Sequence, residues 1–400
     1  MENLGLVITT LGALLLLGLA GDLLSRWLPI PRVTLLIIFG VLIGSSGLAL
    51  LPASAESWYP LISNVALLMV GFLLGGKLSL ANLRQVGGYV LGISLAEVLG
   101  AALFVFAGLL LVGAPAPLAL VLAGIAPASA PAAVTNVVEE LEARGRYTDT
   151  LMGIVAIDDA WGLILFSLLL ALAQMVGTGA EGTAWEAVGH GAWELGGALG
   201  LGLLIGVPAA FLTGRLHPGT PTQAEALGVV LLAGGLALWL EVSYLLTALV
   251  VGATVVNLAY HHDRPFSEIE YMDWPFMILF FLLAGASLHV DKLAHLGWIG
   301  LAYIAMRVLG LVVGAYAGGG LAGAEPRIRR WMGLAIMPQA GVALGMALVA
   351  GEAFPHLKDT ILPLVVGSTV VFELLGPVMT RLALIRAGET ARGAGRSWLE

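Results

Sequence analysis

The chain has 400 residues, of which 59% are hydrophobic and only 11% are charged, and its mean hydropathy is +0.98. A soluble domain usually carries about 25% charged residues, so this composition excludes an ordinary soluble protein and indicates a protein embedded in a membrane. The net charge of -8 gives no indication of a nucleic-acid partner. The absence of cysteine excludes disulfide and thiolate chemistry.

Apolar runs recur along the whole chain. A helix of about 20 such residues crosses roughly 30 Å of hydrocarbon, and short polar connections separate the runs. The sequence therefore predicts an all-α polytopic protein with about 13 transmembrane helices. We expect the helices near residues 3–24, 30–51, 60–76, 87–112, 117–138, 149–176, 189–213, 224–240, 243–259, 274–290, 296–319, 331–352 and 360–386.

The basic residues indicate an orientation. If the spans alternate, fifteen of the 18 Lys and Arg residues fall in connections on one side. By the positive-inside bias this side is cytoplasmic, and an odd number of spans then places the amino terminus outside and the carboxyl terminus inside. We expect a multi-pass protein of the cell's inner (cytoplasmic) membrane.

Two of the expected spans contain helix-breaking residues. The span at 117–138 includes "IAPASAPAAV", with Pro127 and Pro131 on either side of Ser129, and the span at 331–352 includes "MPQAG", with Pro338 before Gln339. Proline frees backbone carbonyls, which in lipid is tolerated only where they face protein or a watery cavity.

The two interrupted spans occupy matching places in the chain. Each is the middle span of a triplet, 87–176 or 296–386, and the triplets enter the membrane from opposite sides. This arrangement predicts an inverted repeat with two crossed, broken helices, which is where transporters place their binding sites.

Ionisable residues lie within the expected spans, where burying a charge is costly. They are Glu97, the neighbours Asp158 and Asp159, Arg307 and Glu373. Successive residues on a helix point about 100° apart. We therefore expect Asp158 to pair with Arg307, while Asp159 faces the crossing and binds either a cation or protons.

The other charged residues have smaller expected roles. Glu97 and Glu373 would accept hydrogen bonds from the broken helices or pair with Arg307. The sequence has no GxxxxGK[ST] phosphate-binding motif, so we expect an exchanger driven by ion gradients, without ATP, cofactor or enzymatic activity.

These residues resemble the monovalent cation/proton antiporters, in particular the NapA-like sodium/proton branch with an Asp-Asp pair. The likeness includes "IPRVTLLIIFGVLIGSSGL", "VALLMVGFLLGGKLSLANLR", "PASAPAAVTNVVEE" before "LMGIVAIDDAWGLILFS", "YLLTALVVGATVVN" and "MPQAGVALGMAL", and it covers nearly the full length. It implies that Asp159 is the principal ion-binding residue, that Asp158 pairs with the basic residue at 307, and that Ser129 and Thr135 help to coordinate the ion.

The resemblance also implies a domain organisation. It predicts a homodimer with scaffold helices at 1–86 and 189–290, an elevator-like transport core at 87–176 and 296–386, and a short cytoplasmic tail at 387–400. The transported ions would be Na⁺ (or Li⁺ or K⁺) and H⁺.

One residue departs from the family pattern. The Asp-Asp branch typically has lysine where this chain has Arg307, and arginine does not give up its proton in proteins. Either Asp158 carries a second proton, or the exchange is electroneutral, which we favour. A potassium/proton antiporter of the same fold remains the nearest alternative. A sodium-coupled organic anion symporter and a non-transporting sensor or scaffold are more distant ones.

Overall fold

The chain is helical throughout the part that the structure describes. The computed structural model describes residues 4–25, 32–52, 55–81, 84, 87–177, 184–213, 222–259, 263–286, 297–339 and 341–390. The helices are α1 (Leu4–Ser25), α2 (Arg32–Ile43), α3 (Ala55–Lys77), α5 (Gly88–Leu111), α6 (Ala116–Ile125), α7 (Pro131–Glu140), α8 (Arg146–Gly177), α9 (Ala184–Thr213), α10 (Thr222–Trp239), α11 (Tyr244–Leu258), α12 (Asp263–Ala286), α14 (Gly297–Leu321), α15 (Pro326–Ala335), α16 (Gly341–Ala353), the short 3₁₀ helix η1 (Pro355–Leu357) and α17 (Lys358–Ala387).

Many of these helices are long and apolar enough to cross a membrane. Eight of the described helices meet that condition, and five more apolar helices are shorter. Each expected span overlaps a described helix or two described helices in series, and the count of 13 transmembrane helices stays a prediction. The all-helical membrane fold predicted from the sequence is confirmed.

Two helix ends differ from the expected spans. The helix expected at 30–51 ends at Ile43, because "GSSG" follows and the chain turns there, with Ala49 at a φ of 51°. The helix expected at 274–290 begins earlier, at Asp263. Its first turns are polar, so the apolar run does not mark where the helix starts. Apolar runs therefore located these helices but did not locate their ends.

The chain divides into two compact units. Unit 1 comprises Met1–Lys77 and Ala192–His295, and unit 2 comprises Leu78–Gly191 and Leu296–Glu400. Each unit is assembled from two separate stretches of the chain. Most of the tail expected at 387–400 lies outside the described residues, since the description ends at Thr390.

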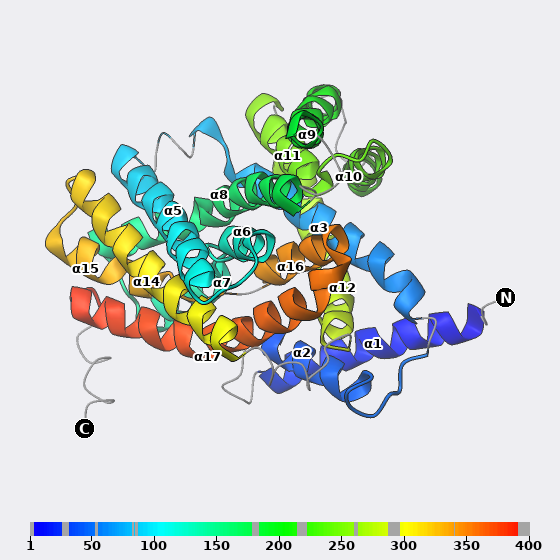
Figure 1. Ribbon diagram of the computed structural model, residues 1–400, viewed down its shortest axis with the longest axis horizontal. Helices are drawn as coiled ribbons and strands as arrows, with labels where there is room; N and C mark the ends of the chain where they lie inside the picture. Colours follow the sequence, from blue (N-terminus) through cyan, green and yellow to red (C-terminus); the bar gives the residue numbers. More distant parts are fainter. Residues whose placement is uncertain are drawn as a thin grey trace. The chain divides into compact units, whose positions relative to one another are not determined.

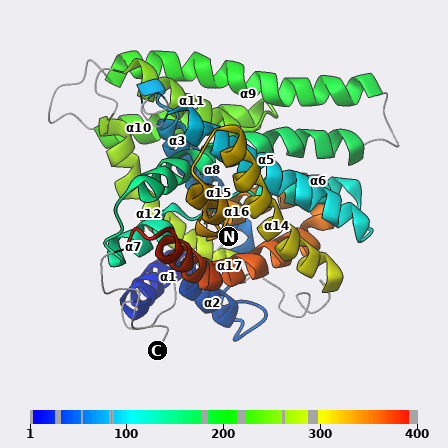
Figure 2. The same cartoon turned by 90° about the vertical axis from the view of Figure 1, so that its left-hand side faces the viewer.

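Unit 1 is held together by close helix pairs. A Cβ atom on Gly75 of α3 would lie 2.7 Å from the backbone nitrogen of Ala253 and 2.9 Å from the Cα of Gly252 on α11. The two backbones can approach this closely because Gly75 and Gly252 lack side chains. Figure 2 shows α9 running alongside α11 in the same unit, where Gly202 of α9 faces Val250 of α11.

Unit 2 has a similar pair in α5 and α14, which lie side by side in Figure 1. A Cβ atom on Gly310 of α14 would lie 2.7 Å from the carbonyl oxygen of Gly100 on α5. One on Gly314 would lie 2.7 Å from the Cα of Glu97. Gly310 and Gly314 are spaced as a small-xxx-small motif, the pattern that lets membrane helices pack backbone to backbone. This packing brings the helix of Glu97 against the helix of Arg307.

Both helix breaks predicted from the prolines are present in unit 2. The first lies between α6, which ends at Ile125, and α7, which begins at Pro131. Proline is tolerated there because the first N–H group of a helix has no helical partner. The second break lies between α15, which ends at Ala335, and α16, and it contains Pro338.

Candidate functional site

The Asp-Asp pair lies in the interior of unit 2. Asp158 and Asp159 are 0% and 2% exposed, near the middle of the long helix α8. A buried carboxylate requires hydrogen-bond donors, a counter-charge or a proton, because an isolated charge in a dry interior is very costly. The surroundings of each aspartate therefore determine what it can do.

Asp159 faces the first break. The backbone N–H of Ser129 donates to Oδ1 of Asp159 at 3.1 Å, and the Ser129 hydroxyl donates to the same oxygen at 3.3 Å. Ser129 precedes Pro131, the first residue of α7, so Asp159 lies by the amino-terminal end of that helix. The helix dipole and the free N–H groups favour a negative charge at this place.

Arg307 connects the two breaks. Its side chain is fully buried, and it donates from Nε to the carbonyl of Ala126 at 2.7 Å. Its other nitrogens donate to the carbonyl of Ala128 at 2.8 Å and to that of Met337 at 2.9 Å. The first two carbonyls belong to the break between α6 and α7, and the third to the break between α15 and α16. Arg307 thus binds carbonyl groups that the interrupted helices leave unpaired.

An aromatic ring completes the surroundings of the guanidinium. Arg307 lies over the ring of Phe372 on α17, with its Cζ atom 4.2 Å from the ring centroid. A cation at this distance from the face of a ring is attracted to it electrostatically.

The ion pair expected between Asp158 and Arg307 is replaced in this structure by the contacts with carbonyls. Within the described residues no ion pair joins the two side chains, although they lie close enough to interact electrostatically. Asp158 accepts a long hydrogen bond of 3.5 Å from the hydroxyl of Ser94, and its carboxylate also lies within hydrogen-bonding reach of Glu97 and Ser129. The planar fork of arginine suits several carbonyls at once, which explains why it can bridge two backbone segments.

Glu97 is a third buried acid in the same interior. It lies on α5 with 0% exposure, and it interacts electrostatically with Asp158 and Arg307. Its carboxyl group lies within hydrogen-bonding reach of the carboxyl group of Asp158. Three acidic side chains and one guanidinium therefore lie together in unit 2, and this imbalance favours bound protons or a bound cation.

Other residues predicted to belong to the site are placed differently. The hydroxyl of Thr135 donates to the carbonyl of Pro131 at 3.0 Å, one turn earlier in α7, so it is used within its own helix. Gln339 is fully buried in the second break, and its side-chain amide lies within hydrogen-bonding reach of Tyr303 on α14. Glu373 is buried on α17, one residue after Phe372.

Some functional groups could not be read from side-chain charges. The carbonyls that bind Arg307 are backbone groups, which every residue possesses, so no residue type marks them in the sequence. Ser94 was missed as well, although it lies three residues before Glu97 and thus on the same side of α5. That spacing was a usable signal.

A cation at Asp159 would need ligands besides carboxylates. No group of three or more His, Asp or Glu side chains in the described residues is arranged to hold a metal ion. The oxygens at this place include those of the Asp159 carboxylate and the Ser129 hydroxyl. Hydroxyl, carbonyl and water oxygens are suitable ligands for a weakly held monovalent cation.

A family model matches nearly the whole chain. Residues 12–386 match the family model described as "Sodium/hydrogen exchanger, transmembrane". No curated protein sequence matches the chain significantly.

Solved structures show the same fold. The chain is similar to the sodium proton antiporter MjNhaP1 from Methanocaldococcus jannaschii at pH 8, with a TM-score of 0.74 and 19% sequence identity, over 98% of this chain and 99% of that one. An electron microscopy structure of MjNhaP1 gives a TM-score of 0.70 and 18% identity, over 97% and 98% of the two chains.

Proposed function

Because the chain belongs to the sodium/hydrogen exchanger family, we propose that it exchanges Na⁺ or Li⁺ for H⁺ across a membrane, with Asp159 as the site at which the two ions compete. The observation that best supports this is the contact of a buried Asp159 with the N–H and hydroxyl of Ser129 in a broken helix. The carboxylate of Asp159 is buried, yet it lies next to a helix break, where backbone N–H and carbonyl groups are not used in helical hydrogen bonds.

Competition follows from the chemistry of a single carboxylate. A protonated carboxyl group is a poor cation ligand, and a bound cation disfavours protonation, so each ion expels the other. If the site meets each side of the membrane in turn, a gradient of one ion drives the other, and no cofactor or chemical reaction is needed.

The proposed role of Arg307 is structural and electrostatic. It holds the carbonyls of both breaks and places a permanent positive charge near the buried acids Glu97 and Asp158. Arginine does not release its proton in proteins, so we assign the exchanged proton to the carboxylates and propose one proton for each cation.

Alternating access is proposed to come from movement of unit 2, which carries Asp158, Asp159 and both breaks, relative to unit 1. In this proposal unit 2 is the transport core and unit 1 is the scaffold of a homodimer. The amino terminus lies outside the cell's inner membrane, and the carboxyl terminus is cytoplasmic.

Cation-induced proton flux in proteoliposomes tests the function. Sodium and lithium are expected to move protons in vesicles that contain the wild-type protein, and Asp159→Asn is expected to abolish the flux while the protein still folds. Flux with potassium alone would identify a potassium/proton antiporter. No flux with any of the three cations would refute the proposal, and uptake of an organic anion with sodium would then indicate a symporter.

A further inference from the structure

The start of α8 has no capping side chain in its own sequence. Gly145 precedes the helix at a φ of +142° and offers no side-chain acceptor, although the first N–H groups of a helix need one. The acceptor comes from Glu389, which follows the left-handed Gly388 at the end of α17. The backbone N–H groups of Tyr147 and Thr148 donate to its two carboxylate oxygens, each at 2.9 Å.

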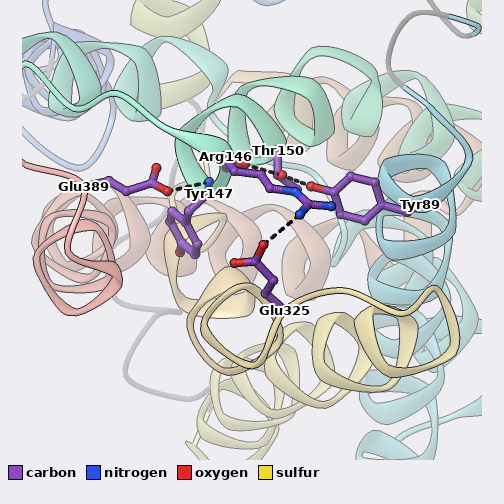
Figure 3. A network of polar contacts seen from close by, with 6 residues as sticks. All are labelled: Tyr89, Arg146, Tyr147, Thr150, Glu325 and Glu389. Carbon is purple, nitrogen blue, oxygen red and sulfur yellow. Dashed lines mark hydrogen bonds and ion pairs between the residues drawn. The ribbon is translucent and has the colours of Figure 1, made fainter.

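The surroundings fit this carboxylate closely. The hydroxyl of Thr148 also donates to Glu389, at 3.0 Å, and the backbone N–H of Arg144 donates to its carbonyl at 3.1 Å. A Cβ atom on Gly145 would lie only 2.7 Å from each carboxylate oxygen, so the glycine leaves the space that Glu389 occupies. Figure 3 shows Glu389 directed at the first turn of α8 beside Tyr147.

The other contacts of the first turn of α8 are weaker. Arg146 forms an ion pair of 2.7 Å with Glu325, next to the start of α15, and it lies 5.8 Å from the ring centre of Tyr89 on α5 (Figure 3). The side chains of Arg146 and Glu325 are 66% and 51% exposed, and exposed ion pairs contribute little. The two charge-assisted hydrogen bonds from backbone N–H groups to Glu389 therefore hold the start of α8 more strongly.

We propose that Glu389 is a positioning residue for ion binding: by capping α8 from the end of α17, it fixes the axial position of the helix that carries Asp159. This inference rests on the proposed function, since it concerns the affinity of Asp159 for its cation. It assigns a role in transport to a residue beyond the last membrane helix.

The effect can reach Asp159 because α8 is continuous. The helix runs from Arg146 to Gly177 with no proline, so a shift of its first turn is carried about 20 Å along its axis. Ser129 belongs to a different segment, and its two contacts with Asp159 are 3.1 and 3.3 Å long. A displacement of well under about 1 Å would take both contacts beyond hydrogen-bond length.

Kinetics of sodium/proton exchange in proteoliposomes test the proposal. Glu389→Ala is expected to raise the apparent KM for sodium about tenfold, with kcat changed by less than about twofold, because small misplacements of binding groups have large effects. Glu389→Gln keeps one accepting oxygen and is expected to raise KM about threefold. The control is Glu140→Gln, which breaks the exposed 2.9 Å ion pair to Arg381 without touching α8, and its KM should equal that of the wild type.

A double-mutant cycle separates positioning from general destabilisation. Ser129→Ala removes the hydroxyl contact with Asp159 but keeps the backbone N–H contact, so Glu389→Ala should raise KM by a smaller factor in a Ser129→Ala background than in the wild type. Hydrogen exchange at the amides of Tyr147 and Thr148 should be faster in Glu389→Ala, which checks that the cap itself is lost.

Two results would overturn the inference: an unchanged KM in both Glu389 variants, or unaltered hydrogen exchange at the two amides. Should Glu389→Ala fail to fold, Glu389→Gln decides by the same criteria. The absence of exchange in the wild type would instead refute the proposed function together with this inference.

Discussion

Arg307 shows how one buried side chain can satisfy two interrupted helices. Its guanidinium donates three hydrogen bonds to backbone carbonyls, and it lies over the ring of Phe372. Because these contacts occupy the guanidinium, its positive charge acts on the nearby acids at a distance and not through a direct ion pair. Unpaired carbonyls in an apolar interior are costly, and a cation that binds several of them stabilises both breaks.

We expect Arg307→Ala to lower the free energy of unfolding by about 3–5 kcal/mol, because it leaves buried carbonyls and buried acids without their partner. Arg307→Lys keeps the charge but not the planar fork, and a loss of about 1–2 kcal/mol is expected. Thermal unfolding in detergent measures both, with the exposed Arg330→Ala as the control. A melting temperature of Arg307→Ala equal to the wild-type value would contradict this account.

The roles of single residues were only partly predictable from the sequence. The burial of Asp158, Asp159, Glu97 and Arg307 followed from their places in apolar runs, and the structure confirms it. The partners of Arg307 did not follow, because a sequence displays side-chain charges but not which backbone carbonyls lack a hydrogen bond.

At the scale of helices, hydrophobic runs and prolines predicted most of the structure. The breaks appear where Pro127, Pro131 and Pro338 indicated them, since proline prevents the continuous hydrogen bonding of a helix. The early end of α2 and the early start of α12 were missed, because hydrophobicity alone does not mark where a helix stops. The cap of α8 was missed too, since Glu389 lies far away in the chain.

We expect the double substitution Pro127→Ala and Pro131→Ala to slow exchange by about tenfold or more, because it favours continuous helix through the first break and moves Ser129 away from Asp159. The rate of sodium-induced proton flux checks this. Pro208→Ala, within α9, is the matched control, because α9 continues through its proline. A double variant with wild-type rates would mean that the break is not required.

At the scale of the whole molecule, the charged residues of the described part that are at most 2% exposed all belong to unit 2; they are Glu97, Asp158, Asp159 and Arg307. The glycine contacts between α5 and α14 and the bonds of Arg307 hold several helices of that unit together. A unit bound in this way can carry an ion as one body, which is the behaviour that an elevator-like exchanger requires.

A permanently charged Arg307 leads to a prediction about charge movement. With one proton exchanged for each sodium ion, transport should move no net charge across the membrane. A voltage-sensitive dye in proteoliposomes should therefore report no change when sodium starts the exchange, while a potassium diffusion potential gives the calibration. A sodium-dependent voltage would mean that a second proton travels, with Asp158 as its carrier.

Proton release on sodium binding is the most direct test of competition at Asp159. When sodium is added to purified wild-type protein in weakly buffered detergent solution, we expect release of about one proton per bound ion, since the two ions share one carboxylate. Asp159→Asn should release none. Equal proton release by the wild type and Asp159→Asn would contradict the account, because the proton would then come from another group.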